Sequence, residues 1–239
     1  MSSLLTKIRD LKRRHFAKKY SKKYGDKFLI DGLEVTIPRT VSPNIRYLLA
    51  KGRPYEEDEI AFVNSVLKKG DDVLELGGSL GLLSRVIRNK IGPLAQHLIV
   101  EADPNLINIV RKNAIIDSDE GRTEVLHRAV AYSEEKSLAF EIGENAHSGK
   151  IADNNAKNTI QVGTITLTNM LKKMSDEKKL VLVSDIEGAE YEMFQNEPRE
   201  TFCRLSNVIV EIHPKLFMSL GKSEEGFIKI LHEKGLSIM

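Results

Sequence analysis

Residues 71–84 read DDVLELGGSLGLLS, and this stretch decides the fold. It begins with the apolar residues Val73, Leu74 and Leu76, as is typical of a buried parallel strand. The run breaks at Gly77 and Gly78 and then continues as an apolar segment that suits a helix. A strand that turns through glycines into a helix lets a small molecule lie against the backbone, where the free N–H groups of the helix start face it. The stretch therefore predicts a ligand site.

The dinucleotide-binding fingerprint G-x-G-x-x-G does not fit this turn. With Gly78 and Gly81 as its second and third glycines, the first would fall on Leu76. The pattern present is E-x-G-x-x-x-G, which resembles the glycine turn of class I S-adenosyl-L-methionine (SAM) methyltransferases. The resemblance implies a SAM cradle made of Glu75, Gly77, Gly78, Ser79 and Gly81. On these residues alone, another nucleotide and a purely structural turn remain alternatives.

Length and composition suit one α/β domain with an extension. The chain has 239 residues, of which 41% are hydrophobic, and no apolar run reaches the roughly 18 residues of a membrane span. The N-terminus lacks the continuous apolar segment of a signal peptide. The single cysteine, Cys203, cannot form an internal disulfide. We therefore expect a soluble, cytoplasmic protein.

The net charge of +2 hides a basic N-terminal segment. Residues 2–23 contain nine of the 36 Lys and Arg residues but one of the 34 Asp and Glu residues, so the remainder carries 27 basic and 33 acidic residues, a net −6. This segment predicts a helix with a stripe at helical spacing that consists of Leu4, Leu5, Ile8, Leu11, His15 and Phe16. The stripe would either dock the helix on its own domain or leave a basic helix that contacts an anionic membrane surface, which would make the protein peripheral, or an acidic partner. Nothing resembles a nucleic-acid-binding fold.

The next segments complete an N-terminal unit, which we place at residues 1–54. Residues 27–38 alternate around Asp31-Gly32, a strong signal for a two-residue hairpin turn. Residues 44–52 suit a short helix. The second unit, residues 55–239, is then the ligand-binding domain.

From residue 56 onward, strands alternate with helices. This order predicts an α/β fold with a doubly wound, mostly parallel sheet of the Rossmann-like class I methyltransferase type, which binds ligands at the carboxyl ends of its strands. The expected strands are the apolar residues 73–76 before the glycines, and residues 97–100, 123–126, 137–142, 160–167, 180–183 and 207–212. Thr168 is expected to cap the helix after the strand at 160–167.

Polar residues stand where two of these strands end. Glu101 closes the second strand, where a carboxylate can accept both ribose hydroxyls of a nucleoside-containing cofactor. Ala102 and Asp103 continue the same loop. Arg128 and Ala129 follow the third strand and are expected on the adenine side of such a cofactor.

Five segments resemble the FkbM family of SAM-dependent O-methyltransferases: LELGGSLG, VEADP, HRAVAYSEEKSLAF, VSDIEGAEYEMF and IVEIHP. The most specific is the D-x-E-G-x-E sequence at residues 185–190. The resemblance runs from about residue 55 to about residue 235. It implies a Rossmann-like fold, SAM as methyl donor, and a carbohydrate or glycosylated metabolite whose hydroxyl accepts the methyl group.

The expected catalytic residues follow the last two strands of the sheet. Asp185 and Glu187 come after the strand at 180–183, and Glu211 and His213 end the strand at 207–212. His213 suits a general base because the ordinary pKa of histidine lies near neutrality, although a core or helix-capping histidine is the alternative. Glu187 and Glu190 would bind acceptor hydroxyls or cap a helix start.

Asp185, Glu211 and His213 also form a rival arrangement, in which they hold a divalent ion that polarises the hydroxyl. No tight ligand spacing supports it, so we expect no metal ion.

The expected function is O-methylation of a carbohydrate hydroxyl. The alternatives are methylation of a lipid-linked glycan, a protein or RNA, and a non-catalytic SAM-binding or scaffold protein with the same fold. The polar loop at residues 143–159, with His147 and Ser148, is expected to cover the site or to stay solvated without a role.

Overall fold

The computed structural model describes residues 4–115, 121–133, 135–143, 149–152 and 158–238. His147 and Ser148 lie outside these residues. The helices are α1 (Leu4–Tyr24), α2 (Pro43–Ala50), α3 (Glu57–Val66), α4 (Leu82–Ile91), α5 (Pro104–Ala114), α6 (Leu167–Leu171), α7 (Glu190–Asn196), α8 (Arg199–Phe202), α9 (Pro214–Ser219) and α10 (Glu224–Glu233). The strands are β1 (Lys27–Ile30), β2 (Leu33–Thr36), β3 (Asp72–Leu76), β4 (His97–Glu101), β5 (Thr123–His127), β6 (Ala129–Val130), β7 (Ser137–Glu141), β8 (Lys150–Ile151), β9 (Thr159–Ile165), β10 (Leu180–Ser184) and β11 (Leu205–Val210).

The central sheet is parallel and has the order β11-β10-β3-β4-β5. The chain builds outward from β3 to β5 and then crosses back to β10 and β11, so the order reverses between β3 and β10. Every residue of β3, β4 and β10 is buried, which explains why these strands are apolar on both faces. The predicted doubly wound, mostly parallel sheet is confirmed. Its reversal point is where this class of sheet binds ligands.

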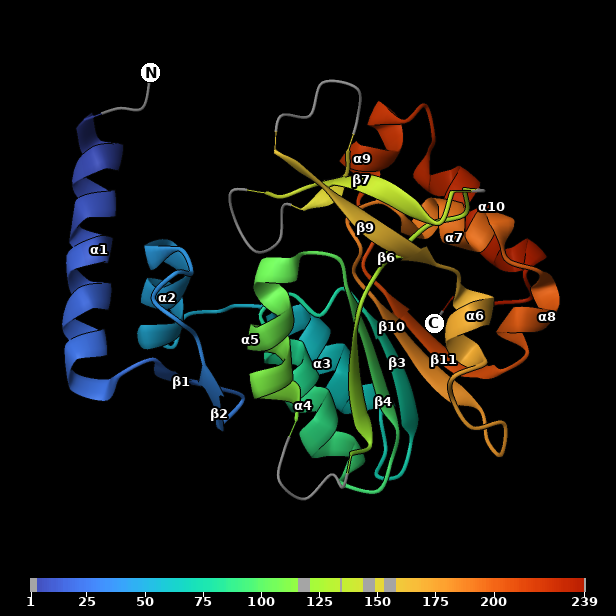
Figure 1. Cartoon of the computed structure of the whole chain (residues 1–239), viewed down its shortest axis with the longest axis horizontal. Coiled ribbons are helices and arrows are strands. Elements are labelled where there is room, and N and C mark those ends of the chain that lie inside the picture. The colour runs from blue at the N-terminus through green and yellow to red at the C-terminus, as the bar shows by residue number, and fades with distance from the viewer. Residues whose placement is uncertain (1–3, 116–120, 134, 144–148, 153–157, 239) are drawn as a thin grey trace.

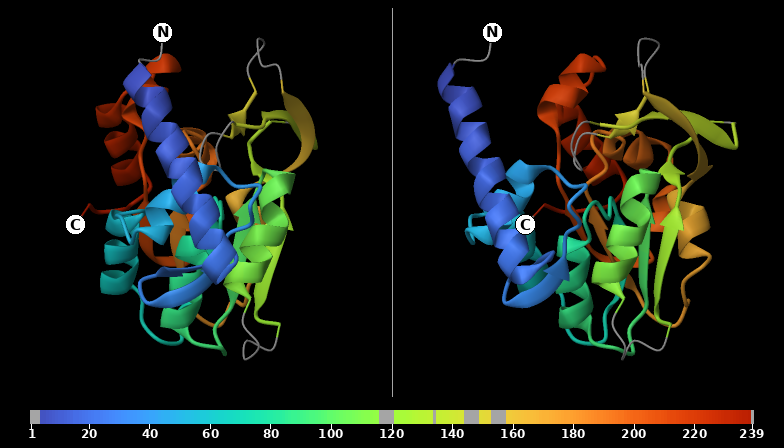
Figure 2. Two further views of the ribbon diagram at one scale, coloured as in Figure 1. Left: turned by 90° about the vertical axis from the view of Figure 1, so that its left-hand side faces the viewer. Right: turned by 60° about the vertical axis from the view of Figure 1, so that its left-hand side comes forward.

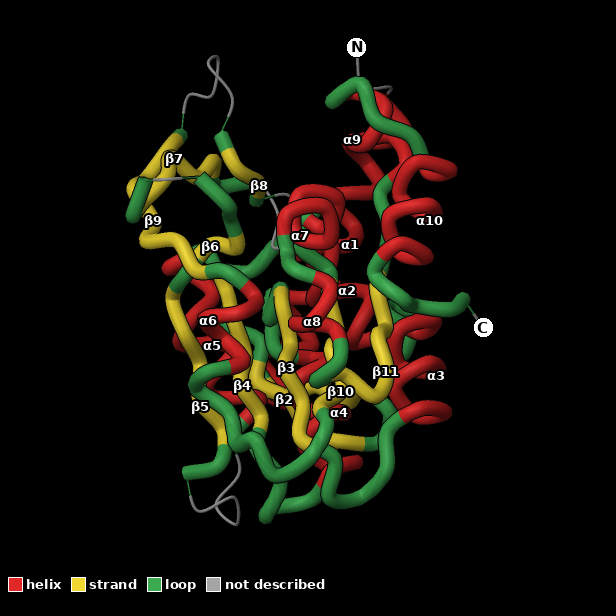
Figure 3. The backbone as a smooth tube through the Cα atoms, turned by 90° about the vertical axis from the view of Figure 1, so that its right-hand side faces the viewer, coloured by secondary structure: helices red, strands yellow, loops and turns green. Residues whose placement is uncertain are grey.

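Helices cover both faces of the sheet (Figure 1). One hydrophobic cluster joins α3, α4 and the N-terminal hairpin to one face. The other joins α6, α7, α8, α9 and α10 to the opposite face. A smaller sheet of order β6-β9-β7-β8 stands beyond the carboxyl ends of the central strands (Figure 3). The region between the two sheets is therefore enclosed on several sides.

The predicted hairpin is confirmed. β1 and β2 pair antiparallel around Asp31 and Gly32, whose φ angles of 47° and 76° are those of a type I′ turn. The hairpin packs into the same core as α3 and α4. The side chain of Asn113 in α5 fastens it: it accepts a hydrogen bond from the Thr36 N–H (2.7 Å), and donates to the carbonyl oxygens of Thr36 (3.1 Å) and Leu80 (2.8 Å). The division of the chain at residue 54 stays a prediction.

Helix α1 forms as predicted but docks through another face than expected. Its contacts come from its C-terminal half, where Ala17 and Ser21 are buried and the ring of Tyr20 stacks on that of Phe28 at 5.1 Å. By contrast, Ile8 is 43% exposed and Leu11 is 69% exposed. Ile8 and Leu11 of the predicted stripe therefore do not dock the helix on its own domain, whereas Phe16 of that stripe packs on Tyr47. Small residues let the helix approach closely, and the aromatic pairs provide the buried area. Figure 2 shows the N-terminal half of α1 projecting beyond the rest of the molecule.

One capping prediction is also wrong. Thr166, not Thr168, is the N-cap of α6 and accepts a hydrogen bond from the Asn169 N–H. The hydroxyl of Thr168 instead donates to the buried carboxylate of Glu197 at 2.6 Å. Strand β9 ends at Ile165, two residues earlier than expected, and this shifts the helix start.

Among the described helices, none is both long and apolar enough to cross a bilayer.

Candidate active site

A cavity that is partly open to solvent lies at the carboxyl ends of β3, β4 and β10. The second sheet closes it from the other side. Nine of the predicted site residues line this cavity, namely Gly77, Ser79, Glu101, Ala102, Asp103, Arg128, Ala129, Asp185 and Glu187.

The glycine turn is shaped by close contacts with protein atoms. A Cβ atom on Gly77, whose φ is 88°, would overlap the carbonyl oxygen of Asp185. One on Gly78 would lie 2.8 Å from Ile99 Cγ2, and one on Gly81 would lie 3.0 Å from the Asn113 Cβ. Gly78 and Gly81 thus let neighbouring elements pack against the turn and do not themselves line the cavity.

Glu75 lies beneath the turn and does not line the cavity either. Its side chain is buried, accepts a hydrogen bond from the Ser84 hydroxyl (2.8 Å) and pairs with His97 Nε2 (2.8 Å). These contacts tie β3 to the first turn of α4 and to the neighbouring strand β4. A direct contact between Glu75 and a ligand stays a prediction.

The contact between Ser84 and Glu75 can be tested through stability. We expect Ser84→Ala to lower the free energy of unfolding by about 2 kcal/mol, because one buried carboxylate oxygen then loses its hydrogen-bond donor. Urea denaturation followed by circular dichroism measures this change. The matched control is Ser65→Ala, which removes an exposed hydroxyl that bonds the carbonyl oxygen of Phe62. Equal losses for the two variants would contradict the structural role of the pair.

Glu101 stands at the end of β4, facing the glycine turn. It is 7% exposed, and its two carboxylate oxygens accept hydrogen bonds from the N–H groups of Ser79 and Asp103, both at 2.7 Å. Burial raises the pKa of this carboxyl group to about 7, although the backbone donors oppose the shift. Each oxygen has a second lone pair that a ligand hydroxyl can use. The site of Glu101 therefore suits a diol.

The far wall of the cavity contains residues that the sequence did not single out. Phe140 of β7 and Ile151 of β8 line it beside Val130 of β6. Arg128 also lines the cavity, and its backbone N–H donates a hydrogen bond to the carbonyl oxygen of Glu101 (3.1 Å). The sequence marked 137–142 as a strand but gave no sign that this strand folds over the ligand site. This wall offers an apolar surface on which a planar ring can lie.

The predicted catalytic residues meet at the carboxyl ends of β10 and β11, the two strands beyond the reversal point of the sheet. His213 Nε2 lies 3.6 Å from Asp185 Oδ1, 3.5 Å from Glu187 Oε2 and 3.8 Å from Glu211 Oε1. His213 occupies the N-cap position of α9 but its side chain makes no capping hydrogen bond. Its Nδ1 atom and Asp185 Oδ1 are buried, with no hydrogen-bond partner in the described part of the chain. A helix-capping role for His213 therefore finds no support in these contacts.

Glu190 fixes the loop between β10 and α7, which contains Glu187. Its buried carboxylate accepts hydrogen bonds from the N–H groups of Ile186 (2.6 Å) and Gly188 (2.8 Å). This clamp holds Glu187 in the left-handed region at φ 51° and presents its side chain to the cavity. Glu190 makes no capping hydrogen bond to α7, because both of its donors precede the helix. Glu187 lines the cavity, and a contact of either residue with an acceptor hydroxyl stays a prediction.

The cluster lies in a strongly acidic environment. Burial, with the charge of Glu59 nearby, raises the pKa of Asp185 to about 6, and burial with the charges of Asp185 and Glu59 raises that of Glu211 to about 7. Burial also raises the pKa of Glu56 to about 8. The sequence indicated Glu56 and Glu59 only as acids at the start of a helix. Nothing in the sequence of α3 shows that its N-terminus lies near Asp185 and Glu211. A positively charged ligand would relieve this repulsion.

A divalent ion is the alternative occupant. Asp185, Glu211 and His213 each offer one ligand atom, and these atoms lie within 4.8 Å of one another. The rival arrangement that we considered from the sequence thus remains geometrically open.

Comparison with known proteins identifies the family of this arrangement. The family model of the methyltransferase FkbM domain matches residues 77–235, more than half of the chain. No curated protein sequence matches the chain.

Three solved structures resemble the fold at low identity. A precorrin-6y C5,15-methyltransferase from Geobacter metallireducens is 11% identical over 75% of this chain and 71% of its own, with a TM-score of 0.41. Fibrillarin from Aeropyrum pernix, solved with natively bound SAM, is 14% identical over 77% and 66%, with a TM-score of 0.44. A SAM-dependent methyltransferase from Aquifex aeolicus is 15% identical over 77% and 81%, with a TM-score of 0.38.

Proposed function

Because the chain belongs to the FkbM family and is a methyltransferase, we propose that it transfers the methyl group of SAM to a hydroxyl of a carbohydrate or glycosylated metabolite. One observation carries this proposal. Glu101 at the end of β4 and the His213 cluster after β10 and β11 lie along the same edge of the sheet, with the end of β3 between them. The first suits the ribose of a nucleoside, and the second suits the proton chemistry of a hydroxyl.

The residues of the cavity fit SAM. Glu101 accepts the two ribose hydroxyls, and the apolar wall with Phe140 and Ile151 receives the adenine ring. Gly77 and Ser79 border the methionine part, close to the carboxylate of Asp185. SAM is a cation at its sulfur, so the acidic surroundings favour it over an anionic nucleotide. When bound, SAM supplies an electrophilic methyl group, whose carbon–sulfur bond breaks as the acceptor oxygen bonds the carbon.

His213 takes the acceptor proton in this proposal. A hydroxyl oxygen becomes a good nucleophile only as its proton leaves, and histidine can accept that proton near neutral pH. The carboxylates of Asp185, Glu187 and Glu211 lie 3.5 to 3.8 Å from His213 Nε2, so they stabilise the imidazolium that forms. Glu187 also lines the cavity, where it can hold a second hydroxyl of a polyol acceptor. Alignment of the acceptor contributes the rest of the rate.

The cofactor part of the proposal is tested by calorimetric titration with S-adenosylhomocysteine. We expect saturable one-to-one binding, with ATP and NAD as control ligands that do not bind. These controls follow from Leu76, which stands where a dinucleotide site has its first glycine. A folded protein that fails to bind S-adenosylhomocysteine would contradict the use of SAM.

The acceptor is tested separately. Methyl-labelled SAM is incubated with the protein and with fractions of source-cell material that contain free sugars, soluble glycans, lipid-linked glycans, protein or RNA. Label in a carbohydrate fraction that resists mild base supports an ether on a sugar hydroxyl. Label confined to the protein or RNA fraction overturns the carbohydrate acceptor and leaves the cofactor result intact.

A further inference from the structure

We propose that the outward face of α1 binds an anionic membrane surface. This face lies apart from the cavity and from every residue assigned a role above. It consists of Ile8, Leu11, Lys12, Lys18, Lys19 and Lys22, and we call it the outward face of α1.

The direction of this face follows from helix geometry. Ile8 precedes the buried Ala17 by nine residues, and Leu11 precedes Tyr20 by nine, which is about two and a half turns of an α-helix. Ala17 and Tyr20 contact the domain, so Ile8 and Leu11 point away from it. In Figure 1, α1 stands at the edge of the molecule with α2 on its inner side.

The charge of the outward face is entirely positive. Lys12, Lys18, Lys19 and Lys22 are all exposed. Asp10 is the acidic residue of this helix, and it is half-buried on the inner side, four residues before Arg14. The basic residues extend along a helix of 21 residues, so the charge is spread over a line and not concentrated at one point.

The combination of lysines with exposed large apolar residues distinguishes a membrane from other polyanions. An interfacial helix inserts apolar side chains between lipids while its lysines contact the anionic headgroups. A nucleic acid offers phosphates but no apolar layer for Leu11, which is 69% exposed, or for Ile8. Single-strand binders also rely on aromatic stacking residues, and this side of α1 offers no Phe, Tyr or Trp but only the exposed imidazole of His15, four residues after Leu11. An anionic bilayer can therefore contact both the lysines and the apolar side chains of this face, whereas RNA can contact only the lysines.

The inner side of α1 makes this surface rigid. Tyr47 packs edge-to-face on Phe16 at 5.4 Å, and buried Arg46 donates hydrogen bonds to Ser21 and, at 2.8 Å, to Asp26. The helix is therefore already formed and oriented before it meets a partner. Because deletion of α1 would expose Phe28 and remove a partner of Arg46, point variants of the outward face are the better probes.

The test is co-sedimentation of the full chain with vesicles of phosphatidylcholine that contain phosphatidylserine, against vesicles of phosphatidylcholine alone. We expect binding to the anionic vesicles, weakened by salt. Lys18→Glu/Lys19→Glu/Lys22→Glu should lower the partition coefficient on the order of a hundredfold, since each lysine near an anionic surface contributes roughly fivefold. Leu11→Ser should lower it roughly tenfold.

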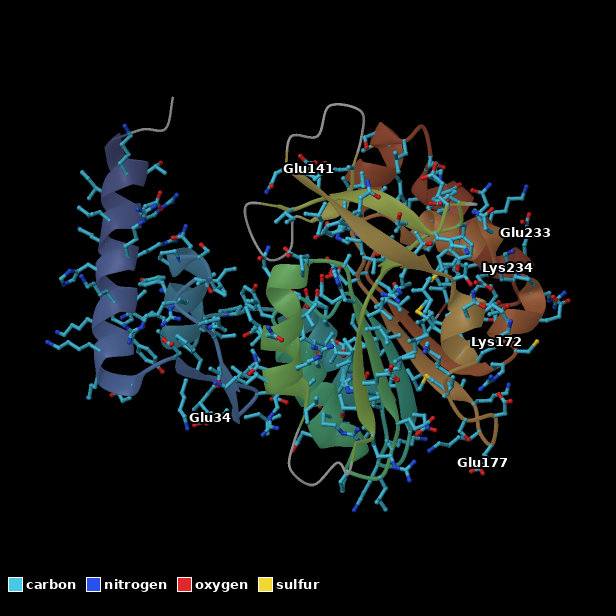
Figure 4. The ribbon with its side chains drawn as sticks, in the orientation of Figure 1. Glu34, Glu141, Lys172, Glu177, Glu233 and Lys234 are labelled. Carbon is cyan, nitrogen blue, oxygen red and sulfur yellow. The ribbon has the colours of Figure 1, made fainter. Side chains whose placement is uncertain are left out.

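Two control variants match these changes elsewhere on the surface. Lys172→Glu/Lys173→Glu/Lys179→Glu alters the net charge equally, and Lys172 lies on the opposite side of the molecule from α1 (Figure 4). Leu94→Ser replaces a leucine that is 73% exposed. Both controls should bind vesicles like the unaltered protein. Binding of S-adenosylhomocysteine should be the same in all variants.

Absence of binding to the anionic vesicles overturns the proposal. So does equal loss in the control variants, which would indicate attraction by net charge alone. A third contrary result is that Leu11→Ser binds vesicles normally while single-stranded RNA or polyglutamate displaces the protein at equal charge concentration. That result would assign the face to a soluble polyanion.

Discussion

Glu101→Gln is expected to weaken the binding of S-adenosylhomocysteine roughly a hundredfold or more, because hydrogen bonds to a charged acceptor contribute about 1.5–3 kcal/mol each. The carboxylate accepts from the N–H groups of Ser79 and Asp103 and still has lone pairs for two ribose hydroxyls. A glutamine has one oxygen in place of two, and its NH₂ group faces one of these backbone N–H donors. Calorimetric titration measures the change.

A matched variant tests whether the weaker binding is specific to Glu101 or follows from the loss of any buried carboxylate. Glu190→Gln also replaces a buried carboxylate that accepts two backbone N–H groups, but this residue does not line the cavity. It should change the dissociation constant for S-adenosylhomocysteine severalfold at most. Similar losses in the two variants would contradict the assignment of Glu101 to the ribose.

Glu101 also predicts how binding depends on pH. Its pKa is raised from 4.5 to about 7 by burial, so its ionised fraction increases about tenfold between pH 6 and pH 8. Affinity for S-adenosylhomocysteine should rise over this interval, and the rise should be absent in Glu101→Gln. The free energy of unfolding of the ligand-free protein should instead decrease as the pH rises over this interval. Because the pKa is higher in the folded state, the contribution of this group is fully present below pH 4.5 and is lost as the pH rises through about 7.

His213→Ala is expected to lower kcat by about 10² to 10⁴, the usual range for a lost general base, with the acceptor found by the labelling screen. The dissociation constant for S-adenosylhomocysteine should change by less than about threefold, because His213 is not among the residues that line the cavity. His232→Ala is the control, since His232 is an exposed histidine of α10.

The same assay distinguishes the base from a metal ligand. A base role predicts that dialysis against EDTA leaves kcat unchanged. Loss of turnover in EDTA, followed by recovery with a divalent ion, would favour the ion held by Asp185, Glu211 and His213. Full activity of His213→Ala would contradict both roles.

The strand ends could be predicted from the sequence because parallel strands bring their carboxyl termini to one edge. Glu101, Asp185 and His213 follow three apolar runs, so the topology rule alone places them together. The direction in which the side chain of Glu75 points could not be predicted from this rule. All five residues of β3 are buried, hence no alternation shows which side chains point toward a ligand and which toward α4.

Two other features depend on contacts between distant segments. Phe140 reaches the cavity because β7 pairs with β9 in the second sheet, and no local pattern encodes that pairing. Helix α1 shows a second limit, because the most apolar stripe of a helix is usually the buried one. Here Ala17 and Ser21 are buried instead, since small residues permit close approach and the aromatic rings beside them cover the area.

The hydrogen bonds between Thr36 and Asn113 have a consequence for synthesis of the chain. The two residues are 77 positions apart, and the hairpin also needs α3 and α4 to cover its apolar side. At translation rates of about 5–20 residues per second, residue 113 emerges roughly 4–15 s after residue 36. During this interval Phe28, Ile30, Val35 and Ile37 lack their later partners. The apolar side of the hairpin can therefore be covered completely only after α5 has been synthesised.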